Sequence, residues 1–97
     1  MTTQVQIIPR LERKAVMFDP LMQERIAKKI EMISAMDIDA VLSVSHRLRT
    51  TDAAKNVWVT NVGPDLRLLF SRTGPVSIEV IDVVTHDDLD KFAFRQS

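Results

Sequence analysis

The pattern of apolar and polar positions divides the chain into a helical N-terminal half and a strand-rich C-terminal half. Val5 to Ile8 is a short apolar run that Pro9 ends, because proline has no backbone N–H with which to continue a strand. We therefore expect a short edge strand there. Residues Pro9 to Met17 then predict a brief helix, with Pro9 in its first turn and an inner side formed by Leu11, Ala15 and Phe18.

The strongest helix-start signal follows. Asp19 is suited to cap a helix and Pro20 to occupy its first position. The next apolar residues recur at helical spacing and predict one buried stripe, formed by Met22, Ile26, Ile30 and Ile33. We expect Asp37-Ile38-Asp39 to end this helix, and residues 40–49 fit either a loop or a poorly formed strand.

Three strands are predicted after residue 56: Val57 to Val62, Leu66 to Ser71, and Val76 to Val84. The connections, Gly63-Pro64-Asp65 and Arg72-Thr73-Gly74, both carry glycine where a hairpin needs it. The order predicts an antiparallel meander.

The register of the second hairpin can be chosen from its pattern, because a slip of one residue moves every side chain to the other face. A three-residue loop with Gly74 at positive φ places Arg67 opposite Glu79 and leaves Leu69 exposed. It pairs Phe70 with Val76, Leu68 with Ile78 and Leu66 with Val80, and it predicts a core face of Leu66, Leu68, Phe70, Ile78 and Val80.

The end of the chain carries a helix-start pattern in Thr85-His86-Asp87-Asp88, where a threonine and an aspartate three residues later can satisfy free backbone N–H groups. This predicts a short helix to about Phe94. The predicted fold is one α+β domain over residues 1–97, with two N-terminal helices packed on a small antiparallel sheet and a short C-terminal helix.

Composition places the chain among ordinary globular proteins, with 45% hydrophobic and 27% charged residues. There is no cysteine, which removes disulfide and thiolate chemistry and fits a reducing compartment. The N-terminus lacks a signal-peptide pattern and nothing resembles a membrane span, so we expect the cytoplasm. The 13 basic and 13 acidic residues cancel, although residues 44–72 are mainly basic and the charged residues of 79–90 are all acidic.

Three local sequences together resemble the RelE/ParE superfamily of toxins from bacterial type II toxin–antitoxin systems. They are His46-Arg47-Leu48-Arg49 with Val57-Trp58, then Gly63 to Phe70, then Ile81 to Asp88. The resemblance extends over nearly the whole chain. Its most specific parts are the arginine of the middle strand, followed by two leucines and an aromatic residue, and the His-Asp-Asp after the last strand.

The resemblance implies a RelE-like fold and, for members that are endoribonucleases, metal-independent cleavage of messenger RNA, often on the ribosome, which inhibits translation. A ribose 2′-hydroxyl attacks the adjacent phosphate, so the reaction needs a base, cationic groups and an acid. By resemblance Arg67 and His86 are the catalytic candidates, and Arg47, Arg49 and Lys55 are candidates for binding RNA phosphates. The implied partners are a cognate antitoxin, messenger RNA and the ribosome, with a homodimer or a hetero-oligomer with the antitoxin as possible assemblies.

The chain departs from this pattern at several positions. Where some members have two lysines on the first meander strand, it has Trp58 and Thr60, and it contains no tyrosine. An alternative is therefore a non-catalytic, ParE-like or degenerate binding module that acts on a protein such as gyrase or only pairs with an antitoxin. Simpler roles also fit: an ordinary cross-strand pair for Arg67, a capped helix start for His86 and a solvated loop for Arg47 and Arg49.

No cofactor or metal is expected. His46, His86 and the C-terminal aspartates do not match the spacing of a metal-ligand motif.

Overall fold

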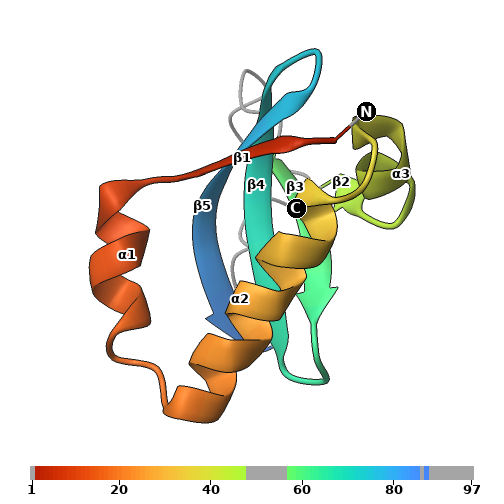
Figure 1. The fold of residues 1–97 in the computed structure, drawn as a ribbon. Coiled ribbons are helices and arrows are strands. Elements are labelled where there is room, and N and C mark those ends of the chain that lie inside the picture. The colour runs from red at the N-terminus through yellow and green to blue at the C-terminus, as the bar shows by residue number, and fades with distance from the viewer. Residues whose placement is uncertain (1, 48–56, 86, 88–97) are drawn as a thin grey trace, which may run out of the picture.

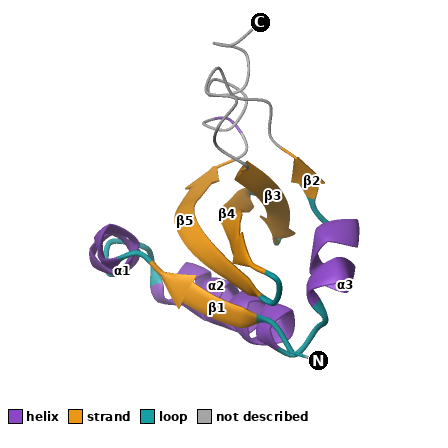
Figure 2. Cartoon of the chain, turned by 90° about the horizontal axis from the view of Figure 1, so that it is seen from above, coloured by secondary structure: helices purple, strands orange, loops and turns teal. Residues whose placement is uncertain are grey.

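The computed structural model describes residues 2–47, 57–85 and 87, in which one sheet has helices packed against one of its faces (Figures 1 and 2). The elements in chain order are β1 (Gln4–Ile7), α1 (Pro9–Ala15), α2 (Pro20–Ser34), α3 (Ile38–Ser43), β2 (His46–Arg47), β3 (Val57–Val62), β4 (Leu66–Gly74) and β5 (Ser77–Thr85). The predicted α+β class is confirmed.

The strand order in the sheet is β1-β5-β4-β3-β2. Strands β2 to β5 pair antiparallel with their neighbours, as the meander predicted, and β1 is an edge strand. However, β1 pairs with β5 in parallel, so the sheet is mixed rather than wholly antiparallel. The first strand of the chain is therefore held by the last described one.

The start of α2 confirms the predicted cap. The Asp19 side chain accepts a hydrogen bond of 2.8 Å from the backbone N–H of Met22, and Pro20 follows at the first helical position. Of the predicted stripe, Ile26 and Ile33 are buried. The helix therefore begins where the sequence provides an acceptor for its free N–H groups and packs through the stripe that its periodicity predicted.

The core lies between α2 and the sheet. The predicted core face of β4 and β5 is confirmed, since none of its five residues is more than 3% exposed: Leu66, Leu68, Phe70, Ile78 and Val80. Leu11 of α1, and Ile38 and Val41 of α3, join the same cluster. At the far end of α2, Thr3 is buried and donates a 2.7 Å hydrogen bond to the Met36 carbonyl, which ties β1 to the end of the helical layer.

The segment after α2 was predicted incorrectly. Residues 38–43 form helix α3 rather than a loop or strand, and within the described part of the ambiguous segment, up to residue 47, His46 and Arg47 form strand β2. Ile38 and Val41 are buried and lie three residues apart, so both face the core from one turn of helix. The helix is only six residues long, and its stability therefore depends on this packing more than on its local sequence.

The predicted register of the second hairpin was also wrong. Strand β4 continues to Gly74, which pairs with Ser77, so the turn lies at Pro75-Val76 and Gly74 does not have positive φ. Proline favours the second position of such a turn and pushes the preceding residue into an extended conformation. As a result Phe70 pairs with Val80, Leu68 with Val83, and Leu66 with Thr85.

Two further boundaries differ from expectation. Helix α1 ends at Ala15 instead of Met17, and Val16 and Met17 are exposed in the connection to α2. The predicted C-terminal helix lies outside the described residues, apart from Thr85, which ends β5, and Asp87.

Replacing Phe70 with alanine should destabilise the fold by about 3–5 kcal/mol, because the ring is fully buried and its removal leaves a cavity. Urea unfolding followed by circular dichroism measures this loss. The control is Met17→Ala, since Met17 is 85% exposed and its replacement should change stability by less than about 0.5 kcal/mol. Similar losses in both variants would contradict the assignment of the core.

Candidate functional site

The face of the sheet away from α2 carries Arg67. Residues directly opposite each other on neighbouring strands point to the same side, so the ladder assigns every position to a face. Arg67 lies opposite Asn61 of β3 and Val84 of β5, between the buried positions Leu66 and Leu68 on its own strand. Arg67 therefore projects away from the helices, as predicted.

The predicted cross-strand partner of Arg67 is incorrect. Glu79 lies opposite Ser71, because the longer β4 moves it along the strand. Instead, the half-buried Arg67 donates from Nη1 to the Leu66 carbonyl at 2.9 Å, with a longer contact of 3.5 Å to the Pro64 carbonyl. The guanidinium is thus held near the β3–β4 turn without an ion pair to Glu79.

That turn contains Gly63, whose φ of 80° glycine adopts readily because it has no Cβ. On its other side, the Arg25 side chain of α2 lies over the glycine, close enough that an added Cβ would be 3.6 Å from Arg25 Cδ. The turn that positions the Arg67 guanidinium is therefore also packed against α2.

His46 shares the face of Arg67. It is exposed on β2 and lies opposite Val59, which in turn lies opposite Leu69. Asn61 of β3 is also exposed and lies directly across from Arg67. We call His46, Asn61 and Arg67 the polar trio. Sequence reasoning missed Asn61 altogether, and it considered His46 as part of the family-like motif and as a metal ligand but gave it no place beside Arg67. The signal that could have found Asn61 is the alternation of β3, which separates it from the buried Thr60 and Val62.

Of the predicted RNA-binding residues, only Arg47 belongs to the part of the chain that the structure describes. Arg47 is exposed and lies opposite Trp58, which in turn lies opposite the buried Phe70. Because Phe70 faces the helices, Arg47 is on the helical side of the sheet as well. Trp58 itself packs against the core. Arg49, Lys55 and His86 lie outside the described residues.

An apolar cluster lies beside the polar trio. Leu69, predicted to be exposed, is 5% exposed and packs with Val57 and Val59, with Ile81 and Val84 against them. The prediction failed because alternation says which face a side chain points to but not whether that face is covered. Leu69 therefore does not provide an exposed surface for a partner.

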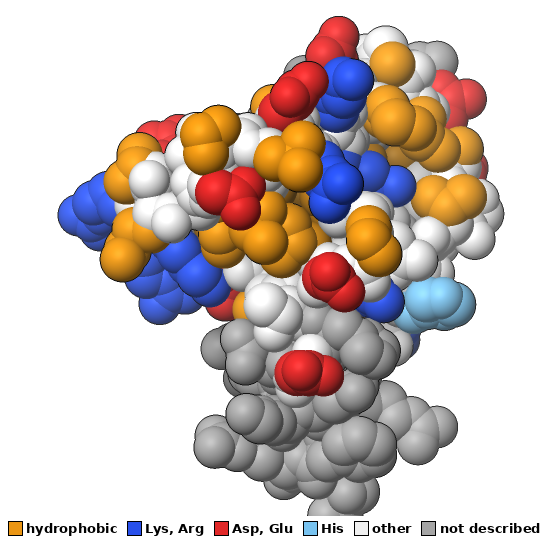
Figure 3. Space-filling model, turned by 90° about the horizontal axis from the view of Figure 1, so that it is seen from below, with side chains coloured by type: hydrophobic (Ala, Val, Ile, Leu, Met, Phe, Trp, Pro, Cys, Tyr) orange, Lys and Arg blue, Asp and Glu red, His pale blue; other side chains and the backbone are white. Residues whose placement is uncertain are grey.

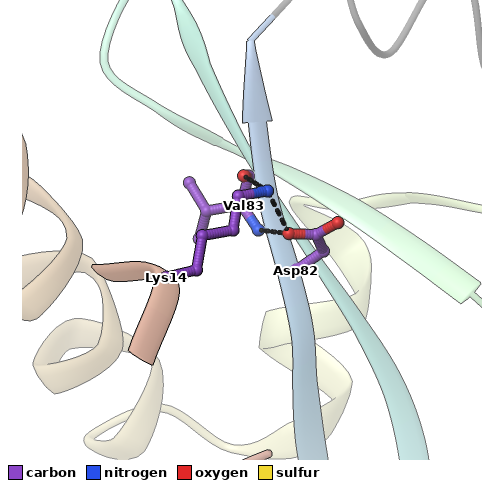
Figure 4. Close-up of polar contacts among 3 residues, drawn as sticks. All are labelled: Lys14, Asp82 and Val83. Carbon is purple, nitrogen blue, oxygen red and sulfur yellow. Dashed lines mark hydrogen bonds and ion pairs between the residues drawn. The ribbon is translucent and has the colours of Figure 1, made fainter. Parts of the chain in front are cut away.

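The outer edge of β5 is closed by polar side chains beyond the end of β1. The Lys14 ammonium lies 2.7 Å from Asp82 Oδ1 and donates to the Val83 carbonyl at 3.1 Å (Figure 4). The same Asp82 oxygen accepts a 2.8 Å bond from the Val83 N–H. Both backbone groups of Val83 are thus satisfied, and α1 is held against β5.

A shallow apolar cleft lies between α1 and α2. It has a volume of about 260 Å³ and is lined by Ala15, Val16, Gln23, Ile26, Ala27 and Ile30. Val16 is 74% exposed, and Met17 next to it is 85% exposed. Seen from below, hydrophobic side chains lie among Lys and Arg side chains on the described surface (Figure 3).

No group of three or more His, Cys, Asp or Glu side chains in the described part of the chain could hold a metal ion. Among the helices described, none is long and apolar enough to cross a membrane.

The architecture defines an α+β protein with a RelE-like fold. The structure is similar to a chain of the archaeal RelE–RelB complex from Pyrococcus horikoshii OT3, with a TM-score of 0.65 and 14% sequence identity. The match covers 88% of this chain and 96% of that chain. No protein-family model matches the sequence, and a search of curated proteins finds no match.

We expect the Lys14 and Asp82 side chains to be weakly coupled. With exposed fractions of 44% and 34%, they should show a coupling free energy of about 0.2–1 kcal/mol. A double-mutant cycle of Lys14→Met and Asp82→Asn, measured by urea unfolding at low and high salt, tests this. The coupling should shrink at high salt, because salt screens exposed charges. A coupling of zero at low salt would show that the pair does not stabilise the fold.

Proposed function

We propose that this chain is the toxin of a toxin–antitoxin pair and acts in the cytoplasm as a metal-independent endoribonuclease that cleaves messenger RNA and so inhibits translation. The single observation that carries the proposal is the position of Arg67, which lies on the sheet face opposite the helices of a RelE-like fold. The sequence motifs around Arg67 support the same conclusion, since they resemble those of RelE/ParE toxins.

Arg67 is suited to bind the phosphate that is cleaved. A guanidinium offers five N–H donors in a planar fork and can bind two phosphate oxygens at once, which a lysine ammonium cannot do in the same geometry. As the 2′-hydroxyl attacks, negative charge builds on the phosphate oxygens, and a positioned cation stabilises that charge. Asn61, directly opposite, adds amide hydrogen-bond donors at the same place.

The sequence-predicted acid or base His86 and the phosphate-binding candidates Arg49 and Lys55 remain part of the proposal. Arg47 lies on the other side of the sheet, beside Trp58. We assign it to contacts with RNA or the ribosome outside the cleavage site.

Replacing Arg67 with alanine should lower the rate of RNA cleavage by about 10²–10³-fold, as expected when one group that stabilises transition-state charge is removed. The cleavage rate of Arg67→Lys should fall between those of the wild type and Arg67→Ala, because lysine keeps the positive charge but cannot bind two phosphate oxygens as the planar guanidinium does. The measurement is growth after induced expression together with mapping of messenger RNA ends. The same variants, purified, are checked for folding by circular dichroism.

Arg72→Ala is the matched control. Arg72 is an exposed arginine on the same strand that bonds to the Gly74 and Pro75 carbonyls at the other end of the hairpin. Its cleavage rate should remain that of the wild type. Growth arrest without new RNA ends in the wild type would reject the ribonuclease and support the non-catalytic binding module, whereas no arrest would reject the toxin assignment.

We propose that the antitoxin binds the apolar cleft between α1 and α2 through a helix with an apolar face. The cleft is open at the surface, its wall includes the small residues Ala15 and Ala27, and the exposed Val16 and Met17 extend it. An amphipathic helix fits such a groove by placing its apolar stripe in it. A complex of this kind is a hetero-oligomer.

Ala27→Arg should prevent neutralisation by the antitoxin while leaving growth arrest intact, because a long charged side chain would fill the cleft, which is lined by α1 and α2, whereas Arg67 projects from the opposite face of the sheet. The test is co-expression with the cognate antitoxin, followed by measurement of growth and co-purification. Met32→Arg is the control, since it adds arginine to an exposed position of α2 that does not line the cleft. Equal neutralisation of both variants would place the antitoxin elsewhere.

A further inference from the structure

We propose that the cleft between α1 and α2 selects a partner helix whose apolar stripe is flanked by lysine or arginine side chains. This inference rests on the proposed binding of the antitoxin at the cleft and adds the charge of the segment that binds. The observation behind it is that three exposed carboxylates border the cleft, those of Glu12, Glu24 and Glu31. An apolar lining accepts many apolar stripes, so the charges around it decide which helices are excluded.

Helix α2 places two carboxylates along one side of the cleft. Ala27 lines the cleft, and Glu24 and Glu31 stand three residues before it and four residues after it. Residues three and four apart are neighbours on a helix surface, so both carboxylates lie beside Ala27. They are separated by about 10 Å along the helix axis. Lys28 projects about 100° further round the helix than Ala27, away from the cleft.

Helix α1 places the third carboxylate on the other side. Glu12 is three residues before Ala15 and four before Val16, and both of these line the cleft. Glu12 also lines a smaller apolar cavity of about 80 Å³, which shares Ala15, Ile26 and Ile30 with the cleft. The two helices therefore border one continuous apolar surface with negative charge on both sides.

The three carboxylates are available to a partner. Each residue is exposed, and none makes an ion pair within the described part of the chain. By contrast Gln23, the polar residue of the lining, already donates from Nε2 to the Phe18 carbonyl at 2.8 Å. A helix entering the cleft would thus meet apolar side chains at its centre and negative charge along its edges.

The cations of the same two helices lie mainly elsewhere. Arg25 lies over the β3–β4 turn, and Lys29 follows one turn later on that flank of α2. Lys14 is held against β5 by its ion pair. Arg13, three residues before Val16, is the described cation that neighbours the lining. Three carboxylates against one guanidinium leave the border of the cleft negatively charged.

Charge complementarity therefore favours a basic amphipathic helix as the occupant. The border repels RNA phosphates and anionic lipids, and an acidic helix would bring like charges together. A helix with its apolar stripe in the cleft can place cations seven residues apart against Glu24 and Glu31. A further cation on the other side of the stripe can reach Glu12.

The experiment uses the purified full chain and two dye-labelled helical peptides of about 18 residues, a length at which an isolated helix can form. Both carry the same stripe of leucine and alanine, flanked by lysines in one and by glutamates in the other. The chain has a formal net charge of +0, so its overall charge favours neither peptide. Fluorescence anisotropy at about 0.15 M salt measures both affinities.

The lysine peptide should bind the wild type about 3- to 100-fold more tightly, since each exposed ion pair changes affinity by about 1.4- to 5-fold. The triple variant Glu12→Lys, Glu24→Lys and Glu31→Lys should reverse this preference. Ala27→Arg should weaken the binding of both peptides, because its side chain fills the cleft. Thermal unfolding checks that every variant is folded.

The matched control carries Asp39→Lys, Asp65→Lys and Asp87→Lys, which change the net charge equally at exposed positions that do not line the cleft. It should keep the preference for the lysine peptide, because charges farther apart than about 8 Å are largely screened at this salt concentration. A reversal in this control as well would overturn the assignment of the selection to the three glutamates.

Equal binding of the two peptides by the wild type, or tighter binding of the glutamate peptide, would overturn the selection by charge. No binding of either would also overturn the placement of the antitoxin in the cleft. Self-association of the wild type in sedimentation, removed by Ala27→Arg, would overturn the inference in favour of a second copy of the chain. None of these measurements uses RNA cleavage, so failure of the ribonuclease appears separately in the experiment on Arg67.

Discussion

The alternation of side chains along β4 is the constraint on which the rest of the structure depends. Leu66, Leu68 and Phe70 must all face α2 to form the core, and this forces Arg67 to the opposite side. Shifting β4 by one residue would turn three large apolar side chains away from the core and bury a guanidinium. The loss of free energy would exceed the small net stability of a domain of this size. The packing that stabilises the fold is thus the same packing that positions the arginine.

Sequence reasoning found the elements with strong local signals and failed where distant contacts decide. Asp19 and Pro20 were enough to locate α2, and the alternation of β4 was enough to give the face of Arg67. The helix at Ile38 and Val41 depends on burial against other segments, which a six-residue pattern does not reveal. The register of β4 and β5 was predicted wrongly because Pro75 was not considered as a turn residue. The predicted core face was nevertheless correct, because each of its five residues still points towards the core.

The polar trio shows why the site was harder to predict than the fold. His46, Asn61 and Arg67 come from three strands, and only the ladder places them on one face. The cleft between α1 and α2 belongs to a different part of the molecule. Under the proposed function, a partner that binds only the cleft leaves the Arg67 face uncovered, so a partner that blocks both has to extend around the edge of the sheet.

The short β1 has a consequence for how copies of this chain behave beside one another. It covers β5 only from Ser77 to Val80, and the following stretch of β5 would otherwise present unpaired backbone groups to any extended chain nearby. Lys14 and Asp82 occupy those groups at Val83. An extended chain could therefore not pair with β5 at Val83 without first displacing the Lys14 and Asp82 side chains.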